Sequence, residues 1–181
     1  MSDETRKLDA LMKPLGAIVV IGGLFLGFAP ESIWHGGGVS PASERKAGGD
    51  FTLQDIDGKR WGLAEQRGRV VLVNYWATWC PPCRQETPGL VRLANEYRVK
   101  GVEVVGITLD EDLTAVREFV ARYQIPYRIL IPSNASNLTT MIESIPVTLL
   151  YDHQGRVAKR YVGAVSETTL KRDVEQLLAE Q

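Results

Sequence analysis

The chain has 181 residues, of which 44% are hydrophobic and 24% are charged, and its formal net charge at pH 7 is −1. This length fits one domain with an appendage, and the hydrophobic content is sufficient for a buried core. A near-neutral chain without a basic stripe is not expected to bind nucleic acid. Its two cysteines lie in one short motif, so no structural disulfide is expected elsewhere.

The amino-terminal part of the chain has the pattern of a membrane anchor. Residues 1–13 are polar and include Arg6, Lys7 and Lys13, and residues 15–29 carry no charge. A helix of that length rises about 22 Å, against about 30 Å for a hydrocarbon core. Lys13 and Trp34 suit the two interfaces. We predict a transmembrane helix over residues 14–30, with the amino terminus in the cytoplasm and the rest of the chain outside it, in the periplasm.

A cleaved signal peptide is the alternative, because Gly27 and Ala29 are small, as a cleavage site requires. Pro30 would follow the cut, which favours the anchor. Residues 31–49 contain glycine, serine, proline and small clusters of charge, and this composition predicts a flexible linker. The folded domain is expected over residues 50–181.

The domain is predicted to begin with a hairpin over residues 51–63, whose turn signal is Asp57-Gly58. Residues 70–75 form a short apolar stretch rich in β-branched residues, which predicts a buried strand. After residue 80, Leu90 and Leu93 begin an apolar pattern at helical spacing.

Cys80 and Cys83 stand where this strand ends and the helix begins. The first turn of a helix offers unpaired N–H groups and the positive end of the dipole. Both stabilise a thiolate there and so lower the pKa of the cysteine thiol. Pro81 and Pro82 suit the first helical positions. We expect Cys80 to be an exposed attacking thiol and Cys83 a buried resolving one.

A zinc site and a structural disulfide are the alternatives to a redox dithiol. Zinc needs about four ligands, and the chain has no second cysteine pair and only His35 and His153. His153 lies in a predicted turn and is expected to be exposed. A disulfide closing so short a loop restricts little chain entropy. We therefore expect redox chemistry, with no metal and no cofactor.

The remaining elements alternate between strands and helices. Strands are predicted over residues 102–109, 128–131, 147–151 and 156–162, and helices over residues 113–123, 134–143 and 170–178. The β-α-β-α-β order implies parallel pairing with right-handed crossovers. An α/β fold follows, with a central mixed sheet and helices on both faces.

The motif over residues 76–88, together with Ile145-Pro146-Val147-Thr148, resembles the thioredoxin superfamily and within it the membrane-tethered TlpA/ResA-like thiol–disulfide oxidoreductases. The resemblance covers roughly residues 48 to 180. It implies a thioredoxin-like fold with an amino-terminal β-hairpin and a central insertion. It also implies a cis bond at Pro146 opposite the dithiol, which would leave the Ile145 backbone free to pair with an extended substrate.

The resemblance extends to other candidate site residues. It makes Glu86, three residues after Cys83, an active-site residue; if it is buried, its pKa should rise and it can accept a proton. Trp79 is expected to contact the partner, as are Pro81 and Pro82. Thioredoxin carries a buried aspartate where this chain has Asn74, and an amide cannot transfer protons at ordinary pH.

The resemblance implies thiol–disulfide exchange by a tethered reductant of exported proteins such as apocytochrome c, re-reduced by an upstream membrane thiol reductant. The same chemistry could run as an oxidant or isomerase, because the motif does not fix the direction. A peroxiredoxin-type peroxidase would carry a threonine where this chain has Ala77. A copper-binding module similar to the Sco proteins would have three residues between its cysteines, where this chain has two.

Overall fold

The computed structural model describes residues 38–132 and 142–180. The predicted cytoplasmic segment and anchor, residues 1–13 and 14–30, lie outside these residues. Within the described ranges, none of the helices has the length and apolar character needed to cross a bilayer.

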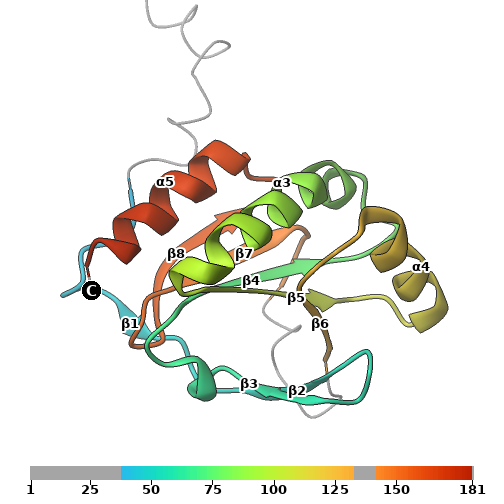
Figure 1. The fold of residues 1–181 in the computed structure, drawn as a ribbon, viewed down its shortest axis with the longest axis horizontal. Helices are drawn as coiled ribbons and strands as arrows, with labels where there is room; N and C mark the ends of the chain where they lie inside the picture. Colours follow the sequence, from blue (N-terminus) through green and yellow to red (C-terminus); the bar gives the residue numbers. More distant parts are fainter. Residues whose placement is uncertain (1–37, 133–141, 181) are drawn as a thin grey trace, which may run out of the picture. The chain divides into compact units, whose positions relative to one another are not determined.

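An eight-stranded mixed sheet forms the centre of the domain, in the order β1-β8-β7-β4-β5-β6-β2-β3 (Figure 1). β4, β5 and β6 are parallel, and β7 runs antiparallel to β4 on its other side. The hairpins β7–β8 and β2–β3 extend the two sides of the sheet. The strands are β1 Lys46–Ala47, β2 Thr52–Asp55, β3 Arg60–Gly62, β4 Val70–Trp76, β5 Val102–Thr108, β6 Arg128–Ile131, β7 Val147–Tyr151 and β8 Arg156–Val162.

Three α-helices, α3 Pro81–Tyr97, α4 Leu113–Tyr123 and α5 Glu167–Leu178, follow β4, β5 and β8. Short 3-10 turns, η1 Ala64–Gln66 and η2 Arg98–Lys100, follow β3 and α3. Each α-helix has an N-cap whose side chain accepts a backbone N–H bond: Cys80 for α3, Asp112 for α4 and Ser166 for α5. The predicted strands and the helices over residues 113–123 and 170–178 are thus confirmed. Of the helix predicted over residues 134–143, only residues 142–143 are described, and they are not helical.

β4 is buried along its whole length, and alternate residues pack on opposite faces of the sheet. Val70 and Leu72 face a core with α3 and α5, and Trp76 faces a second core with α4. On the opposite face, Val71, Val73 and Tyr75 pack with side chains of the β2–β3 hairpin, namely Leu53, Trp61 and Leu63. Among the described residues all three α-helices therefore cover one face (Figure 1), and the expectation of helices on both faces is wrong for this part of the chain. The curled hairpin covers the other face instead.

The segment that precedes the hairpin packs on the domain, which corrects the prediction that the linker extends to residue 49. β1 pairs with β8, and the Ser40 N–H donates to the Ala158 carbonyl at 3.0 Å. The Val39 N–H donates to Oε1 of Gln176 on α5 at 3.3 Å. Residues 38–47, which we call the strap, therefore belong to the fold.

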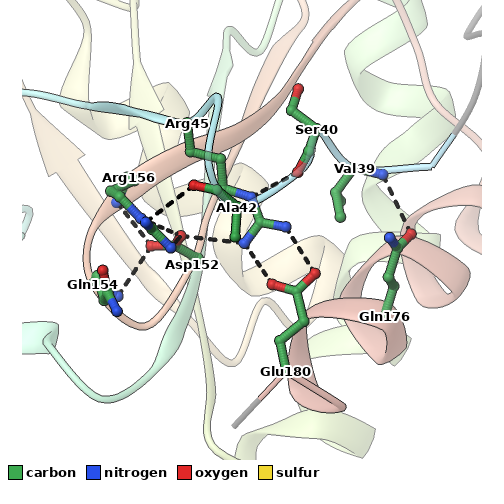
Figure 2. Close-up of polar contacts among 9 residues, drawn as sticks. All are labelled: Val39, Ser40, Ala42, Arg45, Asp152, Gln154, Arg156, Gln176 and Glu180. Carbon is green, nitrogen blue, oxygen red and sulfur yellow. Dashed lines mark hydrogen bonds and ion pairs between the residues drawn. The ribbon is translucent and has the colours of Figure 1, made fainter.

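Arg45 binds the strap to two distant parts of the domain (Figure 2). Its guanidinium contacts Oδ2 of Asp152 at 3.2 Å and both carboxylate oxygens of Glu180, at 2.5 and 2.8 Å. Its Nε donates to the Ser40 carbonyl at 2.8 Å. Arg156 donates to Asp152 at 2.8 Å and to the Ala42 carbonyl at 3.1 Å. The charges in this segment therefore hold it against the β7–β8 turn and the end of α5.

Candidate active site

The two cysteines are joined by a disulfide at the start of α3, with their Cα atoms 5.3 Å apart. Cys80 is the N-cap, and the Cys83 N–H donates to Sγ of Cys80 at 3.3 Å. Pro81 and Pro82 occupy the first two helical positions, where a missing N–H costs nothing. A thiolate at Cys80 would therefore find a backbone donor and the helix dipole already in place.

Both cysteines are nearly covered in this disulfide state, with 3% of Cys80 and 1% of Cys83 exposed. The expectation of an exposed Cys80 is wrong here, because the pair packs within the core that contains Trp76 and Phe119. Trp79, the preceding residue, is the exposed one, at 66%. A partner that approaches Cys80 therefore meets the Trp79 indole at the rim.

Trp76 belongs to the core, and Trp79 is the only one of the two that lies at the rim. The Trp76 ring lies 4.8 Å from that of Phe119, centroid to centroid, and only 3% of the residue is exposed. It also lies across Gly106 on β5, where an added Cβ would fall 2.7 Å from the indole nitrogen. Packing is therefore the role of Trp76.

The Ile145–Pro146 peptide bond is cis, as predicted. Pro146 is buried, and the Ile145 carbonyl oxygen lies 3.8 Å from Sγ of Cys80. The structure thus brings the downstream motif, 65 residues away in the sequence, against the dithiol. This leaves a backbone carbonyl beside the sulfur that a substrate must reach.

Glu86 is buried one turn along α3 from Cys83, with 8% of it exposed. Its carboxylate accepts a bond from Nδ2 of Asn74 at 2.8 Å and one from the Val165 N–H at 3.1 Å. Burial raises the pKa of Glu86 to about 7, against the two hydrogen bonds, which lower it. The burial on which its expected role as a proton acceptor depends is therefore present.

Two residues around this carboxylate were not singled out as site residues in the sequence. Thr148 is fully buried on β7, and its hydroxyl accepts the second bond of the Asn74 amide at 3.0 Å. Val165 contributes only a backbone N–H, from the loop between β8 and α5. Thr148 stands in the downstream motif and could have been found there. The sequence of side chains does not indicate a backbone N–H donor such as that of Val165. Asn74 therefore orients the Glu86 carboxylate by a hydrogen bond, whereas an aspartate at this position could itself exchange a proton.

Neither histidine is part of the described site. His35 lies outside the described residues, and His153 is in the turn between β7 and β8. His153 is half-buried, not exposed as predicted, and its Nδ1 atom is buried without a partner in the described part of the chain. Over residues 38–132 and 142–180 there is no group of three or more histidine, cysteine, aspartate or glutamate side chains placed to hold a metal ion.

Comparison with known proteins agrees with this geometry. Residues 43–178 match the family model described as Redoxin. The chain is 32% identical to the thiol-disulfide oxidoreductase ResA of Halalkalibacterium halodurans, over 70% of this chain and 72% of that protein. It is 36% identical to the thioredoxin-like protein YneN of Bacillus subtilis, over 71% of this chain and 75% of that protein. Among solved structures it is similar to a thiol:disulfide interchange protein of the thioredoxin family from Chlorobium tepidum, with 28% identity and a TM-score of 0.68 over 77% of this chain and 99% of that one.

Proposed function

Because this chain belongs to the Redoxin family, as a ResA-like thiol–disulfide oxidoreductase with a thioredoxin-like fold, we propose that it reduces disulfides in exported proteins such as apocytochrome c. The observation that carries the proposal is the position of Cys80. Its sulfur accepts the Cys83 N–H at the start of α3 and lies beside the Ile145 carbonyl, where an extended substrate can pair with backbone.

The proposed reaction has two exchanges. In the reduced enzyme, the Cys80 thiolate attacks one sulfur of the substrate disulfide and releases the other as a thiolate, which takes a proton from water. The Cys83 thiolate then attacks the Cys80 sulfur and releases the second substrate thiolate. The substrate gains two electrons and two protons, and the enzyme is left with the Cys80–Cys83 disulfide. An upstream membrane thiol reductant would return the enzyme to its dithiol state.

Glu86 is the proposed proton acceptor for Cys83. A group with a pKa of about 7 exchanges protons readily at neutral pH, which suits general-base work. It follows Cys83 by one helical turn, and Asn74 and Val165 fix both of its carboxylate oxygens. Trp79, Pro81, Pro82 and Ile145 would form the surface on which the substrate docks, and the cis bond to the buried Pro146 would orient the Ile145 backbone.

The experiment that tests this function is substrate trapping. In Cys83→Ala the attack on a substrate remains possible but the release step is lost, so mixed disulfides on Cys80 should accumulate in cells. Non-reducing gels followed by mass spectrometry would identify the captured proteins, and apocytochrome c or its maturation factors are the expected ones. Cys80→Ala with Cys83→Ala is the control and should capture nothing.

Other outcomes of the trap would correct the proposal in different ways. A broad set of exported proteins would favour an oxidant or isomerase. Capture by Cys80→Ala alone, and not by Cys83→Ala, would reverse the two cysteine roles. Capture by neither variant would contradict exchange with protein disulfides.

The proposed location is outside the cytoplasm, with the chain tethered through residues 14–30. The support is the uncharged run over residues 15–29, with basic residues only on its amino-terminal side until Arg45. Protease added to intact spheroplasts is expected to remove the domain, while a cytoplasmic marker protein survives. Full protection of the domain under those conditions would contradict this topology.

A further inference from the structure

A carboxylate just beyond the end of the neighbouring strand β5 holds the turn that precedes the dithiol. β4 ends at Trp76 and α3 begins at Pro81, so residues 77–80 form the connection. Asp110, which follows the end of β5, accepts the Thr78 N–H at Oδ2, at 2.8 Å, and the Thr78 hydroxyl at Oδ1, at 2.5 Å. Each oxygen of the carboxylate thus bonds a different group of the same residue.

Asp110 is itself fixed to the sheet. The Thr108 hydroxyl donates to Oδ2 of Asp110 at 2.8 Å and accepts the Asp110 N–H at 3.2 Å. Thr108 is fully buried at the end of β5 and stands opposite Trp76 in the parallel ladder. The Leu109 N–H continues this ladder by donating to the Trp76 carbonyl at 2.9 Å. Asp110 therefore links Thr78 to the end of β5 through hydrogen bonds, which restricts the movement of Thr78.

The residues that follow Thr78 are the ones that a partner meets. Trp79 is 66% exposed, so packing alone does not hold its position, and Cys80 beside it is 3% exposed. The Cys80 N–H donates to the Ala77 carbonyl at 3.3 Å, which fixes the carboxyl side of the turn. On the amino side, Asp110 provides the bonds to Thr78. Both ends of the exposed residue are therefore held.

We propose that Asp110 is a positioning residue for thiol–disulfide exchange: through Thr78 it presents Trp79 and Cys80 to a docking polypeptide. This inference rests on the proposed function, because it concerns how a protein substrate reaches the dithiol. A small disulfide needs no such docking surface, so the two kinds of substrate should respond differently to loss of the carboxylate.

The test compares two disulfide probes in the reduced full-length chain. One is Ellman's reagent, a small aromatic disulfide, and the other is a peptide of about ten residues closed by a disulfide. In Asp110→Ala the rate constant for the peptide is expected to fall about tenfold, because misplaced reacting groups lose the benefit of orientation. The rate constant for Ellman's reagent should stay within about twofold, since a small disulfide does not depend on the docking surface.

Hydrogen exchange of the Thr78 amide gives a readout that does not depend on catalysis. This amide should be protected in the parent chain and lose protection in Asp110→Ala. Thr78→Val removes only the hydroxyl bond and should slow the peptide reaction less than Asp110→Ala. The double variant should be no slower than Asp110→Ala, because the two side chains act through one contact.

Asp112→Ala is the matched control, because Asp112 lies in the same loop and its carboxylate also accepts a backbone N–H, that of Thr114 at 2.8 Å. It caps α4, so its loss should lower thermal stability but leave both rate constants within about twofold of the parent. A peptide rate in Asp110→Ala within twofold of the parent would overturn the inference, as would an equal fall for both probes. A parent chain that reacts with Ellman's reagent but not with the peptide would count against the proposed function. Hydrogen exchange of the Thr78 amide would then still show whether Asp110 holds Thr78.

Discussion

Glu86→Gln is expected to change how the stability of the folded chain depends on pH. Burial raises the pKa of Glu86 from its ordinary 4.5 to about 7, so between these values the folded chain holds a proton that the unfolded chain has lost. The free energy of unfolding therefore falls as the pH rises through this window, by about 3 kcal/mol from this one group. Glutamine is neutral throughout and removes this component.

The measurement is the free energy of unfolding of the oxidised chain in urea, at several pH values from 4 to 8. The difference between Glu86→Gln and the parent should shift in favour of the variant by about 3 kcal/mol as the pH rises across this range. Glu118→Gln, which replaces an exposed glutamate on α4, should follow the parent. Parallel curves for Glu86→Gln and the parent would mean that Glu86 is not buried as a protonated acid.

The same variant tests whether Glu86 accepts a proton from the dithiol. In the reduced parent chain, the rate of thiol alkylation should show an inflection near pH 7 that follows ionisation of Glu86, whose pKa burial raises to about 7. Glu86→Gln should lack this inflection while keeping the one due to the thiol. An unchanged pH profile would leave Glu86 with a structural role only, as the partner of Asn74 and Val165.

The central elements could be predicted because their signals are local. The apolar run of β4, the turn Asp57-Gly58 and the helical spacing after Cys83 each occupy one short window, and parallel pairing follows from the alternation of strands and helices. The dithiol and the downstream proline were also found, since both belong to short motifs. Local pattern therefore identifies the scaffold and the reacting sulfurs.

The contacts that tune the site are not local. The Glu86 carboxylate bonds a side chain 12 residues away and a backbone N–H 79 residues away. Asp110 reaches Thr78 across 32 residues. Which face α4 covers depends equally on packing against Trp76 and Ile129, because an amphipathic helix records that it has a buried face but not what it is buried against. Such pairings appear only once the sheet order is known.

The strap, residues 38–47, is the plainest case of misleading composition. Glycine, serine and proline with scattered charges is what a flexible linker looks like, and the sequence predicts one. The partners of Arg45 lie 107 and 135 residues further along the chain, so nothing near it indicates that it is buried. Only 1% of its side chain is exposed, which turns a residue of the predicted linker into a structural one.

Arg45→Ala is accordingly expected to destabilise the folded chain by about 2–3 kcal/mol, because it leaves charged partners in the fold without their cation. The Asp152 side chain is fully buried, although it keeps two contacts of 2.8 Å with Arg156. The Glu180 side chain is 32% exposed and can turn to water. These two facts place the loss at or just below the lower end of the range for a broken buried pair, which is about 3–5 kcal/mol.

Urea unfolding gives this loss directly, and hydrogen exchange locates it: the Ser40 amide, which donates to Ala158, should lose protection before the amides of β4 and β5 do. Arg67→Ala is the control, because its ion pair with Asp50 joins side chains that are 41% and 56% exposed and should contribute less than about 1 kcal/mol. Arg45→Lys should recover only part of the loss, since an ammonium cannot reproduce the forked contact that the guanidinium makes with Glu180. Equal stability of Arg45→Ala and Arg67→Ala would show that the contacts of Arg45 contribute no more to stability than an exposed ion pair does.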